Sequence, residues 1–253
     1  MPRADDESEA QLVFGQAMDI WIRPEIDARQ RRGVLPPDFR LSKFQVIFRS
    51  PLDSRANLVR LNEEVSALLR CRLENPTNLG DPVAITSSDQ IEEIRLADSG
   101  ERNAAHLTGI RIGDDWLVGF DFTYNRARAS EYLTAAEEFL TVSRDCLDRK
   151  LYRAAVENLF AALELAAMAE MQFLPRKGTT KHIERAKRLQ QSVELGNAPS
   201  GVDSALRYLA ELRGRARYLE ESFSPATKQL DKCYEAAVNL ISHVKLRLPN
   251  EMT

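Results

Sequence analysis

The amino-acid sequence predicts an α+β protein, with an N-terminal antiparallel β domain followed by a C-terminal bundle of five helices. From Met18 to Arg126 the chain carries short apolar runs separated by Gly and Pro, and several of these runs alternate apolar with polar residues. That alternation is typical of strands with one buried face. After Arg128, Ala, Leu and Glu dominate, and Gly and Pro are confined to the gaps between helical segments. We therefore expect a β-rich domain over residues 1–128 and a helical domain over residues 129–253.

The composition is that of a globular protein without a strong overall charge. The 253 residues are 43% hydrophobic, and 35 Lys and Arg nearly balance 38 Asp and Glu. No overall field therefore draws the protein to nucleic acid or to anionic lipid, and a polyanion must be bound by a local basic cluster. The sequence has no apolar run of about 18 residues, and its acidic start MPRADDESEA lacks the pattern of a signal peptide. These features predict a cytoplasmic protein with no membrane partner.

The cysteines indicate a reducing environment. Cys71, Cys146 and Cys233 are far apart in the sequence, and their odd number does not complete a disulfide framework. We expect reduced, buried and unreactive thiols.

Five apolar runs define the expected elements of the β domain. They are MDIWIRPEI (18–26), FRLSKFQVIF (39–48), VRLNEEVSALLRCRL (59–73), HLTGIRI (106–112) and DWLVGFDFTY (115–124). The last two flank Gly113 and Asp114, which tolerate a positive φ, so we expect a β-hairpin there. The pair Pro36-Pro37 predicts a loop between strands.

Other features of this domain are less determined by the sequence. Periodicity leaves the stretch Leu58–Leu73 open between strand and helix, and Asp89–Leu96 is consistent with a short helix. Four aromatic residues stand at strand-like spacing, namely Trp21, Trp116, Phe120 and Phe122. We expect them in the core, with a ligand cavity in a β sandwich or barrel as the alternative.

The helical domain divides into five segments at its Gly and Pro residues. The expected helices are Glu131–Asp148, Lys150–Phe173, a third that ends near Leu195, Val202–Glu221 and a fifth that ends near Leu248. Expected N-caps are Ser130 for the first helix, Thr179 or Thr180 for the third, and Ser224, followed by Pro225, for the fifth. The second helix is apolar on more than half of its circumference, so we expect it at the centre of the bundle.

Three patterns in the helical domain resemble the HEPN family, the helical bundles named for higher eukaryotes and prokaryotes nucleotide-binding. The patterns are the Ala-rich YRAAVENLFAALELAAMAE, the helix start TKHIERAKRL and the segment LRGRARY. The resemblance covers roughly residues 131–248 and implies a homodimer formed through the bundle. In nuclease members, an Arg followed after four to six residues by a His comes from each protomer, and the two motifs form one metal-independent RNA-cleaving site. Family members recur in prokaryotic toxin-antitoxin and phage-defence systems.

The chain departs from the family pattern at the histidine. Arg213 matches the family's arginine, but the histidine position holds Tyr218, and the next histidine is His243. A histidine with a pKa near 6.5 exchanges protons at neutral pH, whereas a tyrosine with a pKa near 10 is ionised in only about 0.1% of molecules near pH 7. We therefore expect a dimeric interaction or RNA-contacting protein that is non-catalytic or weakly active. The alternative is a metal-independent endoribonuclease toxin with Arg213 and Tyr218 as catalytic residues at the dimer seam.

The arginines of LRGRARY have two interpretations. Helical geometry places Arg213 and Arg217 on one face and Arg215 elsewhere. As a binding site, Arg213 and Arg217 next to Tyr218 and Tyr208 would clamp phosphate and stack a base of RNA or of a nucleotide, and Arg215 is a further candidate binding residue. As structural residues, the arginines would pair with acids or lie in the dimer interface, and we favour this because a carboxylate on the apolar second helix needs a partner. The candidate acids are Glu157, Glu164, Glu211, Glu220 and Glu221.

The sequence indicates no metal site and no cofactor. His106 and His182 lack a second His, Cys or carboxylate at metal-ligand spacing, and GIRIG lacks the rest of a phosphate-binding loop. For the β domain we expect recognition or sensing, with a partner protein as a candidate ligand.

Overall fold

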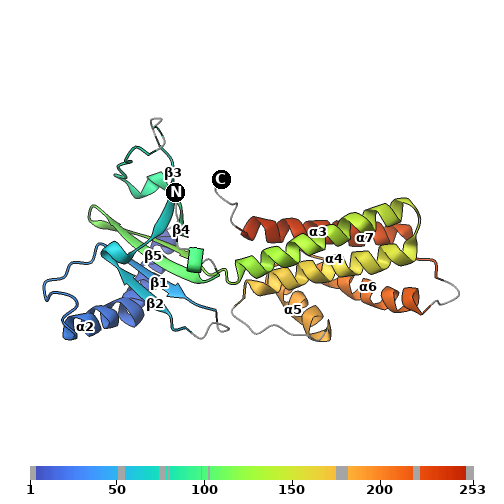
Figure 1. Ribbon diagram of the computed structural model, residues 1–253, viewed down its shortest axis with the longest axis horizontal. Helices are drawn as coiled ribbons and strands as arrows, with labels where there is room; N and C mark the ends of the chain where they lie inside the picture. The colour runs from blue at the N-terminus through green and yellow to red at the C-terminus, as the bar shows by residue number, and fades with distance from the viewer. Residues whose placement is uncertain are drawn as a thin grey trace. The chain divides into compact units, whose positions relative to one another are not determined.

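The chain forms two compact units, Met1–Phe122 and Thr123–Thr253. The computed structural model describes residues 4–50, 55–73, 78, 80–97, 99–101, 103–174, 182–218 and 223–248. The predicted α+β class is confirmed, because antiparallel sheets precede a region of five helices along the chain (Figure 1).

The first unit contains two antiparallel sheets. Its strands are β1 (Lys43–Phe48), β2 (Leu58–Leu61), β3 (Ala67–Cys71), β4 (Ile91–Leu96), β5 (Ala105–Ile112) and β6 (Asp115–Asp121). One sheet has the order β2-β1-β5-β6, and β3 pairs with β4 in the other. The predicted hairpin is confirmed, since β5 and β6 pair across Gly113, whose φ is 62°. The stretch 58–73, for which the sequence did not decide between strand and helix, forms two strands separated by a 3-10 turn at Asn62–Glu64.

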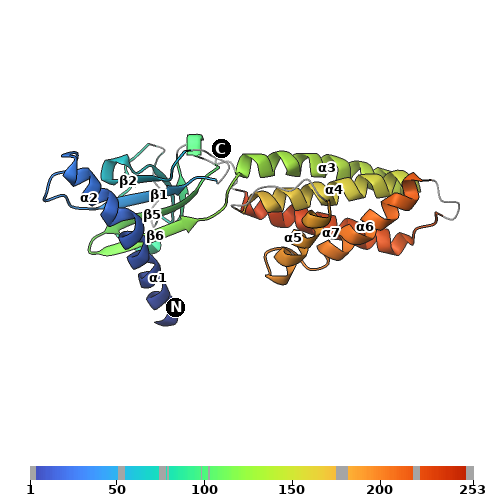
Figure 2. The ribbon, with the colours of Figure 1, turned by 90° about the horizontal axis from the view of Figure 1, so that it is seen from below.

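The expected β element at residues 18–26 is wrong, because this segment is helical. Helix α1 (Ala4–Ala17) continues through a π-helical turn (Met18–Ile22) into α2 (Arg23–Arg31). These helices lie against one face of the four-stranded sheet (Figure 2). Their apolar residues recur every three or four positions and, together with residues of the strands, pack in one core cluster. These residues are Phe14, Met18, Trp21, Ile22 and Ile26. The loop at Pro36-Pro37 therefore joins a helix to β1 and does not join two strands.

The expected short helix at Asp89–Leu96 is also wrong. Residues Ser88–Gln90 form one 3-10 turn, and the strand β4 follows directly. Ile94 of β4 packs against Gly119 of β6, where a Cβ atom would lie 2.8 Å from the Ile94 side chain. Packing against a strand distant in the sequence thus decides the conformation, and local periodicity does not show it.

The aromatic residues of the first unit divide between core and surface. Trp21 and Trp116 pack against the core, as predicted. Phe120 and Phe122 are 62% and 54% exposed, so their assignment to the core is wrong. Strand alternation turns them to the same face as Trp116, but the buried cluster beneath α1 and α2 includes only Trp116 and Val118 from this strand.

The second unit is a helical bundle built around its second helix. The helices are α3 (Arg126–Asp148), α4 (Tyr152–Gln172), α5 (His182–Glu194), α6 (Val202–Arg217) and α7 (Thr227–Arg247). Helix α4 contacts all four other helices, and ten of its residues are buried. Its predicted central position is therefore confirmed.

Two predicted helix starts are wrong. Helix α3 begins at Arg126, before Ser130, because Ala129 is fully buried and continues the apolar stripe of the helix toward its N-terminus. Helix α7 begins at Thr227, after Ser224, because Phe223 instead packs against the bundle core. Thr179 and Thr180 lie outside the described residues.

The cysteines differ in exposure. Cys233 is buried, and burial raises its pKa to about 11, as expected for an unreactive thiol. Cys71 and Cys146 are only partly buried, so the expectation of three buried thiols holds for one of them.

Candidate functional site

Three carboxylates lie on the largely apolar helix α4, and each meets an arginine from a different helix. Glu157 binds arginines of α6, while the Oε1 of Glu164 lies 3.3 Å from Nη1 of Arg185 on α5. Glu170 binds Arg247 of α7 at 2.5 Å. Pairing a buried or half-buried carboxylate in this way offsets the cost of removing it from water. Ion pairs therefore join α4 to three of its neighbours.

Glu157 binds two of the arginines that the sequence singled out. Arg213 Nε donates to Glu157 Oε2 at 2.9 Å. Arg217 donates from Nε to Oε1 at 2.6 Å and from Nη2 to Oε2 at 2.9 Å. The guanidinium of Arg213 also lies 4.5 Å from the centre of the Phe160 ring. The predicted pairing with Glu157 is thus observed, and the two arginines lie side by side as an i,i+4 pair.

Arg153 joins this group from α4, one turn before Glu157. Its Nη1 donates to the carbonyl oxygens of Ala216 at 2.6 Å and of Arg215 at 3.2 Å. These carbonyls belong to the last turn of α6, where backbone acceptors lack helical partners and cations are favoured. We call Arg153, Glu157, Arg213 and Arg217 the arginine cluster. Arg153 was not predicted from the sequence, although its i,i+4 spacing from Glu157 places both residues on one face of α4.

The arginine cluster keeps Glu157 ionised. Burial acts to raise the pKa of Glu157, but hydrogen bonds and charge from Arg217 and Arg213 outweigh it and hold this pKa below its ordinary value. The hydrogen bond to Glu157 in turn raises the pKa of Arg217. The site is therefore a set of fixed positive charges around one carboxylate.

The other candidate residues lie apart from the arginine pair. Helical steps of about 100° turn Tyr208 and Arg215 to the side of α6 opposite Arg213 and Arg217. Tyr208 packs against the bundle core near Cys233 of α7, and burial raises its pKa. Tyr218 follows the last residue of α6 and is 85% exposed, so its ring is open to solvent.

No histidine of the described residues lies in the arginine cluster. His243 Nε2 lies 2.8 Å from the carbonyl oxygen of Asn197 and 3.9 Å from Glu170 Oε2. Glu170 is about 20 Å from Glu157 along α4, at 1.5 Å per residue. His106 belongs to the first unit, where its Nδ1 lies 3.0 Å from Thr108 Oγ1. The side chain of His182 is outside the described residues.

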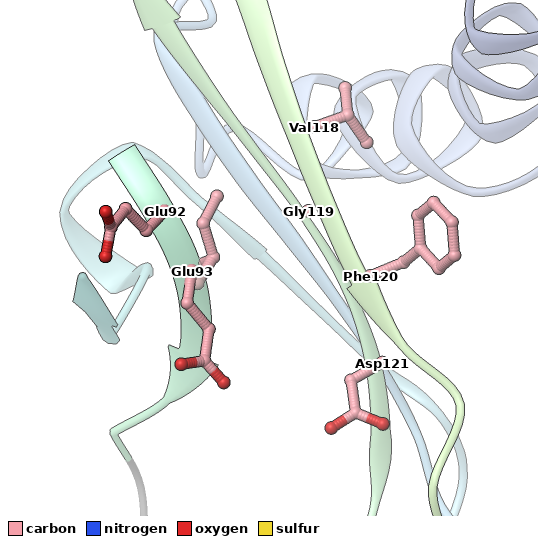
Figure 3. Close-up of a pocket in the computed structure, with 7 residues that line it drawn as sticks. Glu92, Glu93, Val118, Gly119, Phe120 and Asp121 are labelled. Atoms are coloured by element: carbon pink, nitrogen blue, oxygen red, sulfur yellow. The ribbon is translucent and has the colours of Figure 1, made fainter. Parts of the chain in front are cut away.

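The first unit has a hollow of about 420 Å³ between β4 and β6. Figure 3 shows Val118 and Phe120 pointing to the side of β6 away from Glu93. Two of the carboxylates that line the hollow bind arginines, since Glu93 binds Arg95 at 2.5 Å and Glu92 binds Arg72 at 2.8 Å. Among the residues that the structure describes, no three His, Cys, Asp or Glu side chains are grouped so as to hold a metal ion.

Comparison with known proteins adds no family assignment. No protein-family model matches the chain, and no curated protein matches it. Within the described residues, none of the helices has both the length and the apolar character needed to cross a membrane.

Proposed function

We propose that the helical unit is a HEPN-like module that works as a homodimer and contacts RNA without efficient catalysis. In this proposal the β unit recognises a partner protein or senses a ligand. The resemblance to the HEPN family suggests a place in a prokaryotic toxin-antitoxin or phage-defence system.

The observation that carries the proposal is the pair of arginines fixed side by side beside an exposed tyrosine. Arg213 and Arg217 present their guanidinium groups to one oxyanion, the carboxylate of Glu157. The same fork geometry suits a phosphate oxygen. Tyr218, at the end of the same helix, exposes its ring and can stack on a base.

The same geometry argues against efficient cleavage. Metal-independent cleavage of RNA needs a group that takes the proton from the 2′-hydroxyl and another that protonates the leaving oxygen. Tyr218 stands where the family places its histidine, and His243 is bound at the Glu170 end of the bundle. The arginine cluster thus offers charge and hydrogen-bond donors but no proton carrier suited to neutral pH.

Exposed apolar residues on α3 support the homodimer. Phe139 and Val142 are 40% and 46% exposed and lie one turn apart. Ser143 Oγ donates to the carbonyl of Ala155 at 3.2 Å, so this part of α3 lies at the same level of the bundle as Glu157. A second copy that covered Phe139 and Val142 would bury apolar surface near the level of both arginine clusters.

The test is incubation of the purified protein with a mixed RNA pool in EDTA. Wild type, Arg213→Ala and Tyr218→His are compared, with Arg207→Ala as the control. Arg207 lies on the same helix and pairs with Asp203 at 3.5 Å, away from the arginine cluster. We expect wild type and the control to retain RNA with little cleavage, and Arg213→Ala to retain less.

Tyr218→His restores the residue type of the family motif, so we expect it to gain cleavage activity. Efficient cleavage by wild type that disappears in Arg213→Ala would overturn the proposal in favour of an endoribonuclease. If every variant binds RNA as wild type does, or if no protein binds RNA, the arginines are structural only.

A further inference from the structure

The carboxylate of Glu157 is bound as an external oxyanion would be bound. Both of its oxygens accept hydrogen bonds, and Arg217 alone supplies two of them, at 2.6 and 2.9 Å. Arg213 supplies a third at 2.9 Å. Two parallel N–H···O bonds from one guanidinium are the arrangement in which arginine binds either a carboxylate or a phosphate.

We propose that Glu157 is a specificity-determining residue of the RNA site, an internal anion that a phosphodiester group of RNA displaces from Arg213 and Arg217. The inference rests on the proposed function, because it names what regulates binding at the same arginine pair. Glu157 lowers the affinity for any single anion and leaves tight binding to ligands that carry several phosphates.

Exposure distinguishes Glu157 from the other two carboxylates of α4. The side chains of Glu170 and Glu164 are 3% and 17% exposed, whereas that of Glu157 is 29% exposed. Its partner Arg217 is 55% exposed, while Arg185, the partner of Glu164, is only 11% exposed. A ligand from solvent can therefore reach Arg217 and replace Glu157. The Glu164–Arg185 pair is closed on both sides, and at the third pair the Glu170 carboxylate is buried although Arg247 is 31% exposed.

Charge explains the selection for several phosphates. A lone phosphate monoester or phosphodiester only replaces one carboxylate at the same guanidinium groups, so the net gain in binding free energy is small. Arg213 and Arg217 carry two positive charges and share the single carboxylate of Glu157, so Glu157 neutralises only one of the two. A chain of phosphodiesters adds contacts with this remaining charge, and its binding releases counterions.

The test measures binding of a short fluorescein-labelled oligouridine by fluorescence anisotropy at a series of salt concentrations. Full-length wild type is compared with Glu157→Gln and with Glu164→Gln as the matched control. The control makes the same substitution on the same helix, at a carboxylate whose arginine is not accessible. Inorganic phosphate serves as the competing single anion.

We expect Glu157→Gln to bind the oligouridine about threefold to fivefold more tightly than wild type at low salt, the range that a partly exposed ion pair supplies. The dependence of its affinity on salt should also be steeper, because the freed arginines hold counterions that binding releases. Phosphate should compete more effectively against Glu157→Gln than against wild type. Glu164→Gln should bind as wild type does.

Binding by wild type together with equal or weaker binding by Glu157→Gln overturns the inference and leaves the proposed RNA contact standing. Binding by neither protein removes the proposed RNA contact itself, and the inference with it. Circular dichroism checks that the variants are folded. If Glu157→Gln is unfolded, Glu157→Asp retracts the carboxylate from Arg217 without removing its charge, and an affinity no higher than that of wild type contradicts the inference.

Discussion

The pKa values of two carboxylates of α4, Glu157 and Glu170, are shifted in opposite directions by their surroundings. Burial acts to raise the pKa of both, and at Glu157 the hydrogen bonds from Arg217 and Arg213 reverse the effect. At Glu170 the charges of Arg247 and His243 do not outweigh burial, so the pKa of Glu170 stays raised. By linkage, Glu157 stabilises the fold at neutral pH and loses this contribution in acid, whereas ionisation of Glu170 costs stability as the pH rises through its raised pKa.

Glu157→Gln should reduce the free energy of unfolding at neutral pH by about 1 kcal/mol, because the charge-assisted bonds are lost at a partly exposed site. The loss should shrink in acid, as the pH falls through the lowered pKa of Glu157 and the wild-type carboxylate becomes neutral. Urea unfolding at a series of pH values measures both effects. A difference from wild type that stays constant through the acid range contradicts the account.

The sequence predicted that Arg213 and Arg217 share a face and included Glu157 among five candidate acids, but it did not predict the complete cluster. Helical periodicity is enough to place Arg213 and Arg217 on one face, and the need of an apolar helix to neutralise its carboxylates points to Glu157 or Glu164. Arg153 was missed because its role is to bind carbonyl oxygens at the end of α6, and sequence does not reveal where one helix ends against another.

At the scale of elements, single contacts between strands decide what periodicity leaves open. Gly109 of β5 pairs directly with Phe44 of β1, and the Phe44 ring lies over it, so that a Cβ atom would approach the ring to 2.2 Å. Contact with Gly119 similarly fixes β4, which the sequence suggested as a helix. The sequence did not predict the helices at residues 4–31, because five apolar residues among the nine of residues 18–26 also suit a strand.

Gly109→Ala should destabilise the β unit by about 1–3 kcal/mol, because the methyl group overpacks the sheet against Phe44. Gly15→Ala is the control, since a Cβ at Gly15 of α1 meets no atom within 4 Å. Alanine is the better helix former, so the control should be neutral or stabilising by up to about 1 kcal/mol. Thermal unfolding followed by circular dichroism compares the two, and equal stability of both variants would show that the sheet relaxes around the added methyl group.

At the scale of the whole molecule, composition predicted more than local patterns did. The change from Gly- and Pro-punctuated alternation to Ala- and Leu-rich segments gave the confirmed order of sheets followed by five helices. The near balance of 35 basic and 38 acidic residues means that binding of a polyanion depends on a local site such as the arginine cluster. The predicted N-caps at Ser130 and Ser224 were wrong, because tertiary burial of Ala129 and Phe223 overrides local capping signals.

The proposed dimer is also a property of the whole molecule. Light scattering coupled to size-exclusion chromatography should give the mass of a dimer for wild type and of a monomer for Val142→Asp, because a carboxylate would be buried in the interface without a partner. Leu246→Asp is the control, since Leu246 is 87% exposed on α7 beside Arg247, near the Glu170 end of α4. A monomeric wild type, or dissociation by both substitutions, would contradict an interface at Phe139 and Val142.

The most direct test of the central claim is the affinity of the full-length protein for single-stranded RNA, with and without the arginine pair. Wild type should bind RNA with a strong dependence on salt, and the double substitution Arg213→Ala, Arg217→Ala should reduce the affinity at least tenfold while the dimer persists. Arg207→Ala, which removes one exposed arginine from the same helix, should leave the affinity almost unchanged. Equal affinity of the double variant and wild type would contradict the claim and assign Arg213 and Arg217 to the structural pairing with Glu157 alone.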